Sequence, residues 1–382
     1  MLTTRDEVEK MKIICNTAAL TQVCSNIQRC VPSRAVMPML DGILIRTLEG
    51  GLVEFCGYDL ELGSTTVMEA KVEEQGATVI NAKTLVDILR HLPGDRLELY
   101  CSPKNICTIT CGNVEYTIVT MRADEYPELP SLPDAEPISI STTLLRSMIM
   151  QTIFSVSTDE SKAAHRGVKF SLRQGELNLI ALDGYRLATR KEFISYDGAP
   201  HTFIVPAKTL YELVKLLPDE DDFLQIKLSK RHVIFNVNGY NIVSRLLEGD
   251  FIDYQSALPK GITATVRVNT KRFIESIERT SIIVTEKMRS PLRFVFDKDM
   301  IHLSVATALG SASDYMECST DGKRTEIGFN NRYVLEALRA CDADEVLIQL
   351  NGPISPAIIV PTEGDHFLYL ILPVRIKDES GE

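Results

Sequence analysis

The sequence predicts an α+β fold made of three similar domains in tandem. One amphipathic helix is written three times about 124 residues apart, at 82–92, 207–217 and 331–341, with apolar residues at the i, i+3, i+4 and i+7 positions of a buried face. Strand-like runs flank each copy in the same order, so every copy reads as helix, strands, helix, strands. The 382 residues suffice for three domains of about 125 residues, which is near the usual domain size.

The first copy opens with a helix that runs through Leu20 and Ile27. A hairpin corner is expected at Tyr58-Asp59, because Asp tolerates a tight turn. The repeated helix ends before Pro93, which cannot continue it. The predicted strands of this copy lie at 52–56, 60–68, 96–101, 106–111 and 114–121.

The second copy repeats the first almost segment by segment. The stretch 207–210 matches 82–85 nearly letter for letter, and Leu182-Asp183 provides the matching corner. The third copy has the same order, with its opening helix near 270–283. Two halves of like pattern within each copy suggest a further internal duplication. The second copy's opening helix lies at 145–152 and its strands at 177–181, 186–193, 223–229, 232–237 and 240–247.

Each repeated helix carries two basic residues seven positions apart. At about 100° per residue, the two lie within about 20° of one direction, opposite the apolar face. One such pair is usually only a solvated helix face, but three matching pairs indicate a shared role. The pairs are Lys83 and Arg90, Lys208 and Lys215, and Arg332 and Arg339.

Composition excludes some classes of protein. The sequence contains no run of about 18 apolar residues, so no membrane-spanning helix is expected, and residues 1–10 lack a secretory apolar run. The nine cysteines include no C-x-x-C pair, and we expect reduced thiols. Cys101, Cys107 and Cys111 match no common zinc spacing. The net charge of −11 does not exclude nucleic acid, because the local field depends on where the charges lie.

The order of motifs resembles the sliding clamp family, the β subunits of bacterial replicative DNA polymerases. The match extends from about Met11 to Ile376, and the combined order and spacing of the motifs is specific although each is weak alone. The matching segments are MPMLDGILIRTLEGGLVEFCGYDLELG (37–63), ALDGYRLATRKE (181–192), RLLEGDFIDYQSALPK (245–260), EIGFNNRYVLEALRACDADEVLI (326–348) and LYLILPVRI (368–376).

The resemblance implies a head-to-tail homodimeric ring with helices lining the hole and sheets outside. Such a clamp encircles duplex DNA as a processivity factor and tethers the replicative polymerase. The six basic helix residues would then contact phosphates without reading bases. Arg34 lies where the family places a DNA-contacting loop, and Lys162 and Arg166 lie in a second such loop. Ala163 and Ala164 stand where some members carry tyrosines, which disfavours stacking with a single strand.

The resemblance also sets the expected domain limits. Proline and acidic residues concentrate at 124–137 and 249–261, where linkers are expected. Family members tend to begin with a Met-Lys-aliphatic strand, so Met11 is expected to begin the fold. The expected segments are an extension at 1–10, domains at 11–132, 133–260 and 261–376, and a tail at 377–382.

A further implication is a hydrophobic pocket between the second and third domains, which accepts a short peptide from the polymerase, the clamp loader and other partners. Leu187, Leu370 and Leu372 would form its apolar cleft, and Arg186 and Arg375 its polar rim. In the linker, Ile252, Ser256 and Ala257 stand where some family members have Pro, Arg and Val. The first subsite carried over by motif is Asp183, Gly184, Tyr185, Arg186, Leu187, Ile252, Ser256, Ala257, Leu370, Leu372, Pro373, Val374 and Arg375, and the second is Asn330, Tyr333, Ile354 and Pro356.

A homodimer is expected despite weak charge complementarity. Some family members pair a basic strand of the first domain with an acidic strand of the third. Here the corresponding stretches are 113–116 and 309–317, and the latter carries only Asp314 and Glu317 as acids. The seam would therefore be held mainly by packing of Tyr116, Ile118, Ile282 and Ile283.

An enzyme is the competing hypothesis. The acidic run 219–222 could bind Mg²⁺ for phosphoryl transfer, but it lies between a helix and a strand, which favours a solvated loop. The histidines form no close ligand pair, and no P-loop or G-x-S-x-G motif occurs. We expect no catalysis and no cofactor, and a cytoplasmic location on the nucleoid. A scaffold that does not bind DNA is the third hypothesis.

Overall fold

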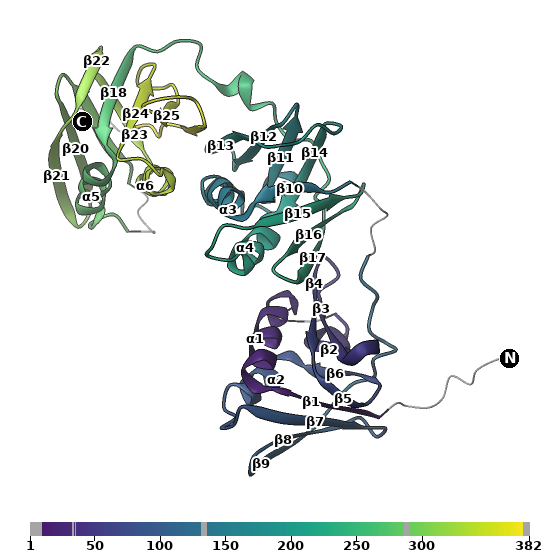
Figure 1. The fold of residues 1–382 in the computed structure, drawn as a ribbon. Helices are drawn as coiled ribbons and strands as arrows, with labels where there is room; N and C mark the ends of the chain where they lie inside the picture. The colour runs from purple at the N-terminus through teal and green to yellow at the C-terminus, as the bar shows by residue number, and fades with distance from the viewer. Residues whose placement is uncertain (1–9, 33, 35, 131–135, 286–289, 377–382) are drawn as a thin grey trace. The chain divides into compact units, whose positions relative to one another are not determined.

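The computed structural model describes residues 10–32, 34, 36–130, 136–285 and 290–376 (Figure 1). The expected extension, apart from Lys10, and the expected tail 377–382 lie outside the described residues. The predicted repeat is confirmed, because each of the three copies contains two helices. Each copy also passes twice through the order strand, helix, strands, as the internal duplication predicted.

The element bounds show the repeat directly. The first copy contains β1 (Met11–Asn16), α1 (Thr17–Ile27), β2 (Gly42–Thr47), β3 (Leu52–Tyr58), β4 (Leu62–Glu69), β5 (Lys71–Glu74), β6 (Ala77–Asn81), α2 (Ala82–Leu89), β7 (Arg96–Ser102), β8 (Ile106–Cys111) and β9 (Val114–Val119). The second contains β10 (Ile138–Ser141), α3 (Thr142–Met150), β11 (Gly167–Arg173), β12 (Glu176–Leu182), β13 (Arg186–Phe193), β14 (His201–Pro206), α4 (Ala207–Leu216), β15 (Phe223–Leu228), β16 (His232–Val237) and β17 (Tyr240–Arg245). The third contains β18 (Ala264–Asn269), α5 (Thr270–Ser281), β19 (Leu292–Asp297), β20 (Met300–Thr307), β21 (Gly310–Glu317), β22 (Ser319–Gly322), β23 (Thr325–Phe329), α6 (Asn331–Ala340), β24 (Glu345–Leu350), β25 (Ala357–Pro361) and β26 (Phe367–Ile371).

Asparagine side chains fix where four of the helices begin. An N-cap oxygen satisfies one of the backbone N–H groups that the first helical turn leaves unpaired. Asn81 Oδ1, for example, accepts from the N–H of Thr84 at 3.0 Å. The capped helices are α1, α2, α5 and α6, whose caps are Asn16, Asn81, Asn269 and Asn330.

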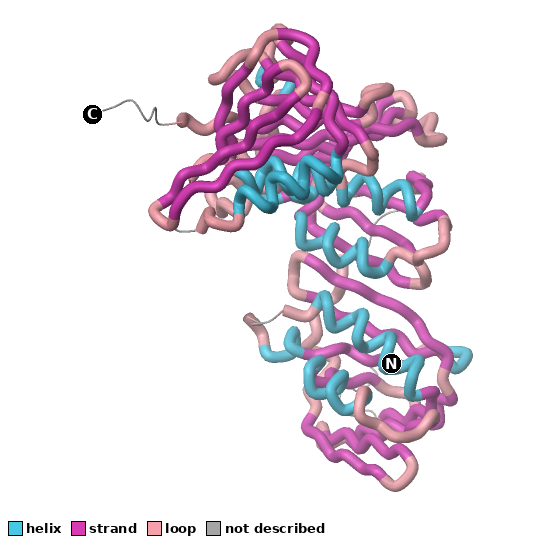
Figure 2. Tube along the Cα trace, turned by 90° about the vertical axis from the view of Figure 1, so that its left-hand side faces the viewer, coloured by secondary structure: helices cyan, strands magenta, loops and turns pink. Residues whose placement is uncertain are grey.

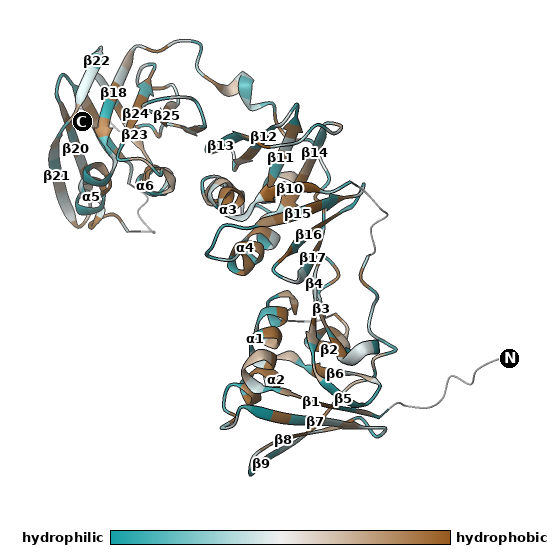
Figure 3. Cartoon of the chain, viewed as in Figure 1, coloured by the Kyte–Doolittle hydropathy of each residue, from teal (hydrophilic) through white to brown (hydrophobic). Residues whose placement is uncertain are grey.

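The predicted apolar stripes are buried. Leu85, Leu210 and Leu338 are fully covered, whereas Leu92 and Cys341 at the ends of their stripes are partly exposed. In the first and third copies the two helices pack side by side, α1 against α2 and α5 against α6 (Figure 2). In Figure 3 the helices carry both brown and teal residues, as one apolar and one polar face require.

The two hairpin corners are built alike. Asp183 Oδ1 accepts from the N–H groups of Tyr185 and Arg186, and Asp59 Oδ1 accepts from the two corresponding N–H groups of its own corner. Gly184 has φ +95°, and Leu60 occupies the matching position at φ 75°. The predicted strand after the first corner therefore begins later than expected, at Leu62.

The described chain divides into two compact units, and the division runs through the second copy. Unit 1 combines Met1–Thr143 with Tyr211–Leu246, and unit 2 combines Leu144–Leu210 with Leu247–Glu382. Unit 1 contains a sheet in the order β5-β1-β7-β8-β9 and a second in the order β10-β15-β16-β17-β4-β3-β2-β6. Unit 2 contains β14-β11-β12-β13-β26-β25-β24-β18-β22 and β21-β20-β19-β23.

Two strand pairs join neighbouring copies within these units. In unit 1, β17 of the second copy pairs antiparallel with β4 of the first, from Tyr240 opposite Thr66 to Ser244 opposite Leu62. In unit 2, β26 of the third copy pairs with β13 of the second. Each boundary between copies is thus crossed by a continuous sheet.

Candidate functional site

The six predicted basic helix residues are all exposed on α2, α4 and α6. Lys215 Nζ lies 2.8 Å from Glu212 Oε1, and Arg339 Nη2 lies 2.6 Å from Glu278 Oε1. Among the described residues, Lys83 and Arg90 form no ion pair. The cations therefore lie opposite the buried stripes, as the spacing predicted, with several held in local ion pairs.

The predicted loop cations are also exposed. Arg34 lies between α1 and β2, and Lys162 and Arg166 lie at the two ends of a short 3-10 turn. A Cβ at Gly184 would lie 3.6 Å from Lys162 Nζ, so this lysine reaches the second hairpin corner. Burial, with a smaller contribution from Lys162, lowers the pKa of His165 and favours its neutral form.

The predicted peptide pocket is centred on the β13–β26 pair. Leu187 lies opposite Leu370, and the N–H of Leu372 donates to the carbonyl of Tyr185 at 2.9 Å. The hairpin corner of the second copy and the terminal strand of the third are therefore held in register by backbone hydrogen bonds. The structure brings most of the predicted first subsite together in this way.

Arg186 is not a rim residue, and this part of the prediction is wrong. Its side chain is buried and lies under the corner, where Nε donates to Asp183 Oδ2 at 3.0 Å and Nη1 donates to Glu336 Oε2. The guanidinium also lies over the Tyr333 ring, 4.5 Å from its centroid. A buried charge with two carboxylate partners and an aromatic face positions neighbouring groups. Arg186 therefore joins the corner to α6.

Glu336 completes this network and was missed by the sequence prediction. Burial alone would raise the pKa of Glu336, but hydrogen bonds from Arg332 and Arg186 outweigh it and lower that pKa. In the sequence, Glu336 is indistinguishable from an ordinary i+4 partner of Arg332 on a solvated helix face. Only the fold brings Arg186 to the same carboxylate.

The expected apolar cleft is partly covered. Leu187 and Leu370 are buried in a cluster against which Phe251 and Tyr254 of the linker pack. Leu372 is 37% exposed, so it is the accessible member of the expected leucine trio. The accessible apolar surface nearby also includes Tyr185, Ile252, Ile354 and Val374.

The predicted second subsite contains an aromatic pair and a helix cap. Tyr185 and Tyr333 stack with centroids 6.3 Å apart. Burial, and then the nearby charge of Asp183, raise the pKa of Tyr333. Asn330 Oδ1 accepts from the N–H of Arg332, so its oxygen serves α6 and its amide nitrogen is the group that could serve a ligand. Pro356 is half-buried, and Ser256 and Ala257 are exposed in the linker.

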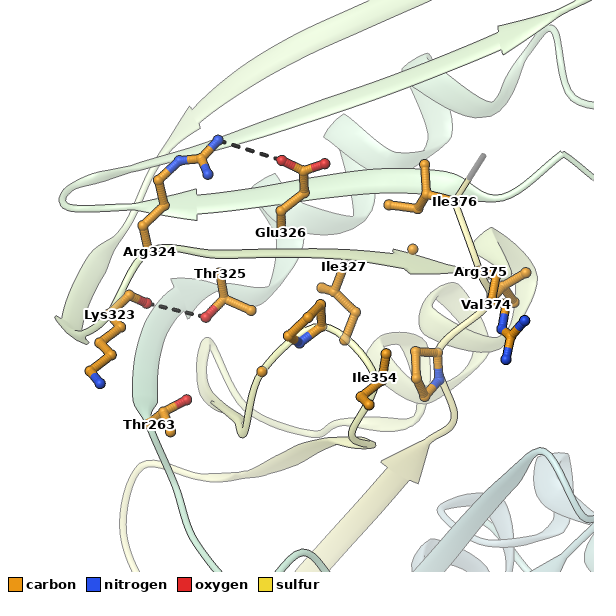
Figure 4. A pocket seen from close by; sticks show the side chains of 14 residues that line it. Thr263, Lys323, Arg324, Thr325, Glu326, Ile327, Ile354, Val374, Arg375 and Ile376 are labelled. Atoms are coloured by element: carbon orange, nitrogen blue, oxygen red, sulfur yellow. Dashed lines mark hydrogen bonds and ion pairs between the residues drawn. The ribbon is translucent and has the colours of Figure 1, made fainter. Parts of the chain in front are cut away.

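A cavity of about 940 Å³ adjoins these residues in the third copy (Figure 4). It shares Ile354, Pro373, Val374 and Arg375 with the predicted pocket and extends along β23, where no sequence pattern indicated a site. Its other lining residues are Thr263, Lys323, Arg324, Thr325, Glu326, Ile327, Gly328, Gly352, Pro353 and Ile376.

The strands predicted for the dimer seam are sheet edges, since β9 and β21 each end a sheet. Tyr116 is 37% and Ile282 is 80% exposed, whereas Ile118 and Ile283 pack partly on the cores of their own copies. Val119, which the sequence prediction omitted, is 80% exposed.

The few acids of the β21 stretch are also engaged. Asp314 accepts from Arg279 Nη2 at 2.6 Å and from Ser276 Oγ at 2.8 Å. Burial alone would raise the pKa of Asp314, but these hydrogen bonds outweigh it and lower that pKa. Because Asp314 is already paired with Arg279, even less negative charge is available for the seam than the sequence suggested.

The acidic run 219–222 has a local structural role. Asp221 Oδ1 accepts from Ser141 Oγ and Thr143 Oγ1, each at 2.7 Å, at the start of α3. These hydrogen bonds, with that from Ser141 the largest, lower the pKa of Asp221. Within the described ranges, no group of three or more His, Cys, Asp or Glu side chains is arranged to hold a metal ion.

The cysteines are buried or half-buried, and all nine are free thiols. Burial raises the pKa of Cys15 to about 11, which disfavours the reactive thiolate. Among the described residues, no helix is long and apolar enough to cross a membrane.

Comparison with known proteins gives one consistent result. Models of the DNA polymerase III beta subunit match in chain order, the N-terminal domain at 11–130, the central domain at 139–253 and the C-terminal domain at 255–375. The beta sliding clamp of Staphylococcus epidermidis is 29% identical over 357 residues, which cover 91% of this chain and 94% of that protein. The beta sliding clamp of Staphylococcus aureus is 29% identical over 366 residues, which cover 93% and 97%.

Solved structures agree over nearly the whole chain. The Bacillus subtilis DNA polymerase sliding clamp has a TM-score of 0.93 and 28% identity, with 96% of this chain and 100% of that chain covered. A Pseudomonas aeruginosa clamp, DNA polymerase III subunit beta bound to griselimycin, has a TM-score of 0.90 and 25% identity, with the same coverage.

The Arg186 network can be tested by comparing the two arginines that bind Glu336. The side chain of Arg186 is 6% accessible and that of Arg332 is 72%. Arg186→Met should destabilise the fold by up to about 3 kcal/mol, because it leaves Asp183 without its ion-pair partner, whereas Arg332→Met should cost less than about 1 kcal/mol. Differential scanning calorimetry measures both midpoints, and equal, small shifts would show that Arg186 does not organise the corner.

Proposed function

This chain belongs to the DNA polymerase III beta subunit family and is a sliding clamp, and from that premise we propose that two copies close head to tail into a ring around duplex DNA. The ring is a processivity factor that tethers the replicative polymerase. Its domains comprise 11–132, 133–260 and 261–376, preceded by an extension at 1–10 and followed by a tail at 377–382. The observation that carries the proposal is the way in which neighbouring copies share sheets.

The joins between copies follow one rule. The last strand of a copy pairs with the third strand after the first helix of the preceding copy, as β17 does with β4 and β26 with β13. Within the described chain, this rule leaves one edge unpaired on the last strand of the first copy, β9, and on the strand of the third copy that corresponds to β4 and β13, which is β21. An exposed edge strand is a template for pairing with another chain. Pairing β9 of one protomer with β21 of its partner satisfies both edges and closes a two-subunit ring.

The rule also gives a register for the seam. Counted from the turns of their hairpins, Val114 of β9 corresponds to Tyr240 of β17. In the same way, Asp314 of β21 corresponds to Thr66 of β4. Since Tyr240 lies opposite Thr66, Val114 is placed opposite Asp314 across the seam. Glu115 is then opposite Ser313, in the places that Asn241 and Thr65 occupy in unit 1.

The proposed DNA-facing residues are those whose charge lies opposite the helix cores. Lys83, Arg90, Lys208, Lys215, Arg332 and Arg339 present exposed cations on helices, and Arg34, Lys162 and Arg166 present them on loops. Duplex DNA carries one charge per about 1.7 Å of axis, so exposed cations meet nearly the same field at every position. Contacts of this kind permit sliding, because they do not read bases.

The partner site combines the Arg186 corner with the terminal strand. A disordered peptide pays an ordering cost on binding, so it needs a preformed surface. Here backbone pairing and the Arg186 network fix that surface before binding, and Leu372, Ile354 and Val374 supply accessible apolar contact. Its ligands are short peptides of the polymerase, the clamp loader and other replication or repair proteins. We expect that the protein catalyses no reaction itself. We also expect it to lie on the nucleoid in the cytoplasm, since the DNA that it encircles is chromosomal.

The seam register predicts a specific disulfide. Glu115→Cys combined with Ser313→Cys should form an intermolecular disulfide under mild oxidation, because cross-strand Cβ atoms at opposed positions lie about 4.5–5.5 Å apart. Non-reducing gels and mass spectrometry of the linked peptide report it. Both positions are exposed within one protomer.

The matched control shifts one partner by two residues. Glu115→Cys with Tyr315→Cys keeps the same sheet face but moves the thiols out of opposition. Cross-linking of this pair at the rate of the in-register pair, or of neither pair, would contradict the proposed seam.

If the basic helix residues face DNA, the affinity for DNA should depend on salt through these residues. Replacing Lys83, Lys208 and Arg339 by Gln should weaken binding to a short duplex and flatten its dependence on salt by about 0.9 in log–log slope for every phosphate that the protein no longer neutralises. Fluorescence anisotropy across a salt series measures both quantities.

A control with the same change in net charge replaces three exposed hairpin lysines, Lys104, Lys230 and Lys298. It should leave the slope unchanged. If both triple variants show the same decrease in affinity and slope, the helices have no special role and only total charge matters.

If the partner site is as proposed, shortening the side chain of Leu372 should weaken peptide binding. Leu372→Ala removes accessible apolar contact worth on the order of 1–3 kcal/mol, or roughly tenfold to over a hundredfold in affinity. The measurement is calorimetric titration with polymerase-derived peptides, and with griselimycin as a second probe. Leu309→Ala is the control, because Leu309 is 65% exposed in the β20–β21 turn. Equal affinities for the parent and Leu372→Ala would place the partner site elsewhere.

A further inference from the structure

The cavity along β23 has a shape suited to an extended chain. From Lys323 to Gly328 it follows five residue steps of backbone, of which Thr325 to Gly328 belong to β23, a span of up to about 17 Å when fully extended. At one end the segment 372–376 crosses β23, and the N–H of Val374 donates to the carbonyl of Gly328 at 2.8 Å. A Cβ at Gly328 would lie 2.6 Å from the Val374 carbonyl oxygen, so glycine permits this crossing. At the other end, the N–H of Lys323 donates to the carbonyl of Thr263 at 3.1 Å.

In the part of the chain that the structure describes, no strand pairs with the edge of β23 between Lys323 and Gly328. β23 is the last strand of its sheet and pairs on one side with β19. Hydrogen-bonding direction alternates along an antiparallel strand, so the N–H and C=O of Glu326 face the same edge as the Gly328 carbonyl. Among the described residues neither group has a partner on that edge. Such an edge pairs with an added extended peptide through main-chain hydrogen bonds.

The side chains beside this edge indicate which kinds of peptide side chain the cavity would bind. Ile354, 84% exposed, and Val374, 40% exposed, provide apolar contact. Lys323 and Arg375 are exposed at opposite ends of the cavity, and within the described ranges neither forms an ion pair. Figure 4 shows Lys323 on the side of β23 that holds Thr263 and Ile354, whereas Arg324 and Glu326 point to the other side.

Arg324 is excluded as an anchor by its own partners. Its Nη2 lies 3.5 Å from Glu326 Oε2 and its Nε lies 3.8 Å from Asp297 Oδ2. The available positive charge along the cavity is therefore that of Lys323 and Arg375.

We propose that this cavity binds the acidic flank of the partner peptide, as an added strand on β23 with a carboxylate on Lys323. The inference rests on the proposed partner site, with which the cavity is continuous through Ile354, Pro373, Val374 and Arg375. Residues that leave the second subsite would run along β23 instead of into solvent. Acidic residues outside the apolar core of a partner peptide would then set how tightly that partner competes for the clamp.

The test uses defined peptides. Overlapping 15-residue peptides of the host replicative polymerase are screened for binding, and the tightest Leu372-dependent one is extended at one end or the other by Glu-Glu or, as the neutral isostere, Gln-Gln. Titration of the intact protein should show that Glu-Glu at one end raises affinity about three- to tenfold over Gln-Gln. Extension at the other end should have no such effect.

Lys323→Gln should remove this preference and leave the affinity of the unextended peptide unchanged. The control Lys271→Gln carries the same charge change at the start of α5, at the other end of β18 from the cavity, and should retain the preference. Lys323→Glu should reverse the preference, so that a peptide with a Lys-Lys extension binds more tightly than one with Glu-Glu.

The two hypotheses fail differently. If Leu372-dependent binding is found but the Glu-Glu and Gln-Gln forms bind equally at both ends, the cavity does not take an acidic flank. A preference that persists in Lys323→Gln also overturns the assignment. If no peptide binds in a Leu372-dependent way, the proposed partner site itself is wrong.

Discussion

Backbone pairing across the boundaries between copies is the constraint on which the rest of the structure depends. Unpaired N–H and C=O groups at a sheet edge are costly when buried and adhesive when exposed. The chain meets this constraint twice internally, through β17 with β4 and β26 with β13. The edges left at β9 and β21 would let the proposed dimer form despite the weak charge complementarity of its seam. Main-chain hydrogen bonds need no complementary charges, and Val119, Tyr116 and Ile282 add exposed apolar surface.

The same constraint positions the residues of the proposed partner site. Pairing β26 with β13 brings the hairpin corner of one copy beside the terminal strand of the next, and the N–H of Leu372 closes on the carbonyl of Tyr185. Arg186 then lies beneath the corner, between Asp183 and Glu336 and over Tyr333. The rigid polar base and the accessible apolar side chains above it arise from one strand pair. A binding surface fixed in this way adds no ordering cost of its own to the cost that a disordered peptide already pays.

Local signals account for what the sequence predicted well. Helix stripes, the prolines that follow them and the Asp corners depend on neighbours within a few residues. The structure has them near the expected positions, although α2 ends at Leu89 instead of continuing to residue 92, and β4 begins at Leu62 instead of Leu60. The burial of Arg186 and the part played by Glu336 were not predictable, because both depend on a strand pair between positions about 180 residues apart in the sequence. The cavity at Lys323 was missed for a similar reason. It depends on the segment 372–376 crossing β23 at Gly328, and such a crossing gives no periodic pattern in the sequence.

A closed ring would hold the protein on DNA by enclosing the duplex. Enclosure can be measured by loading the protein onto nicked circular DNA with the clamp loader of the same cell and following its retention before and after one cut of the circle. We expect retention on the circle through washes at high salt, which screen phosphate contacts, and rapid loss once the DNA is linear. Equal retention on circular and linear DNA, or loss from both at high salt, would contradict enclosure and leave only electrostatic binding.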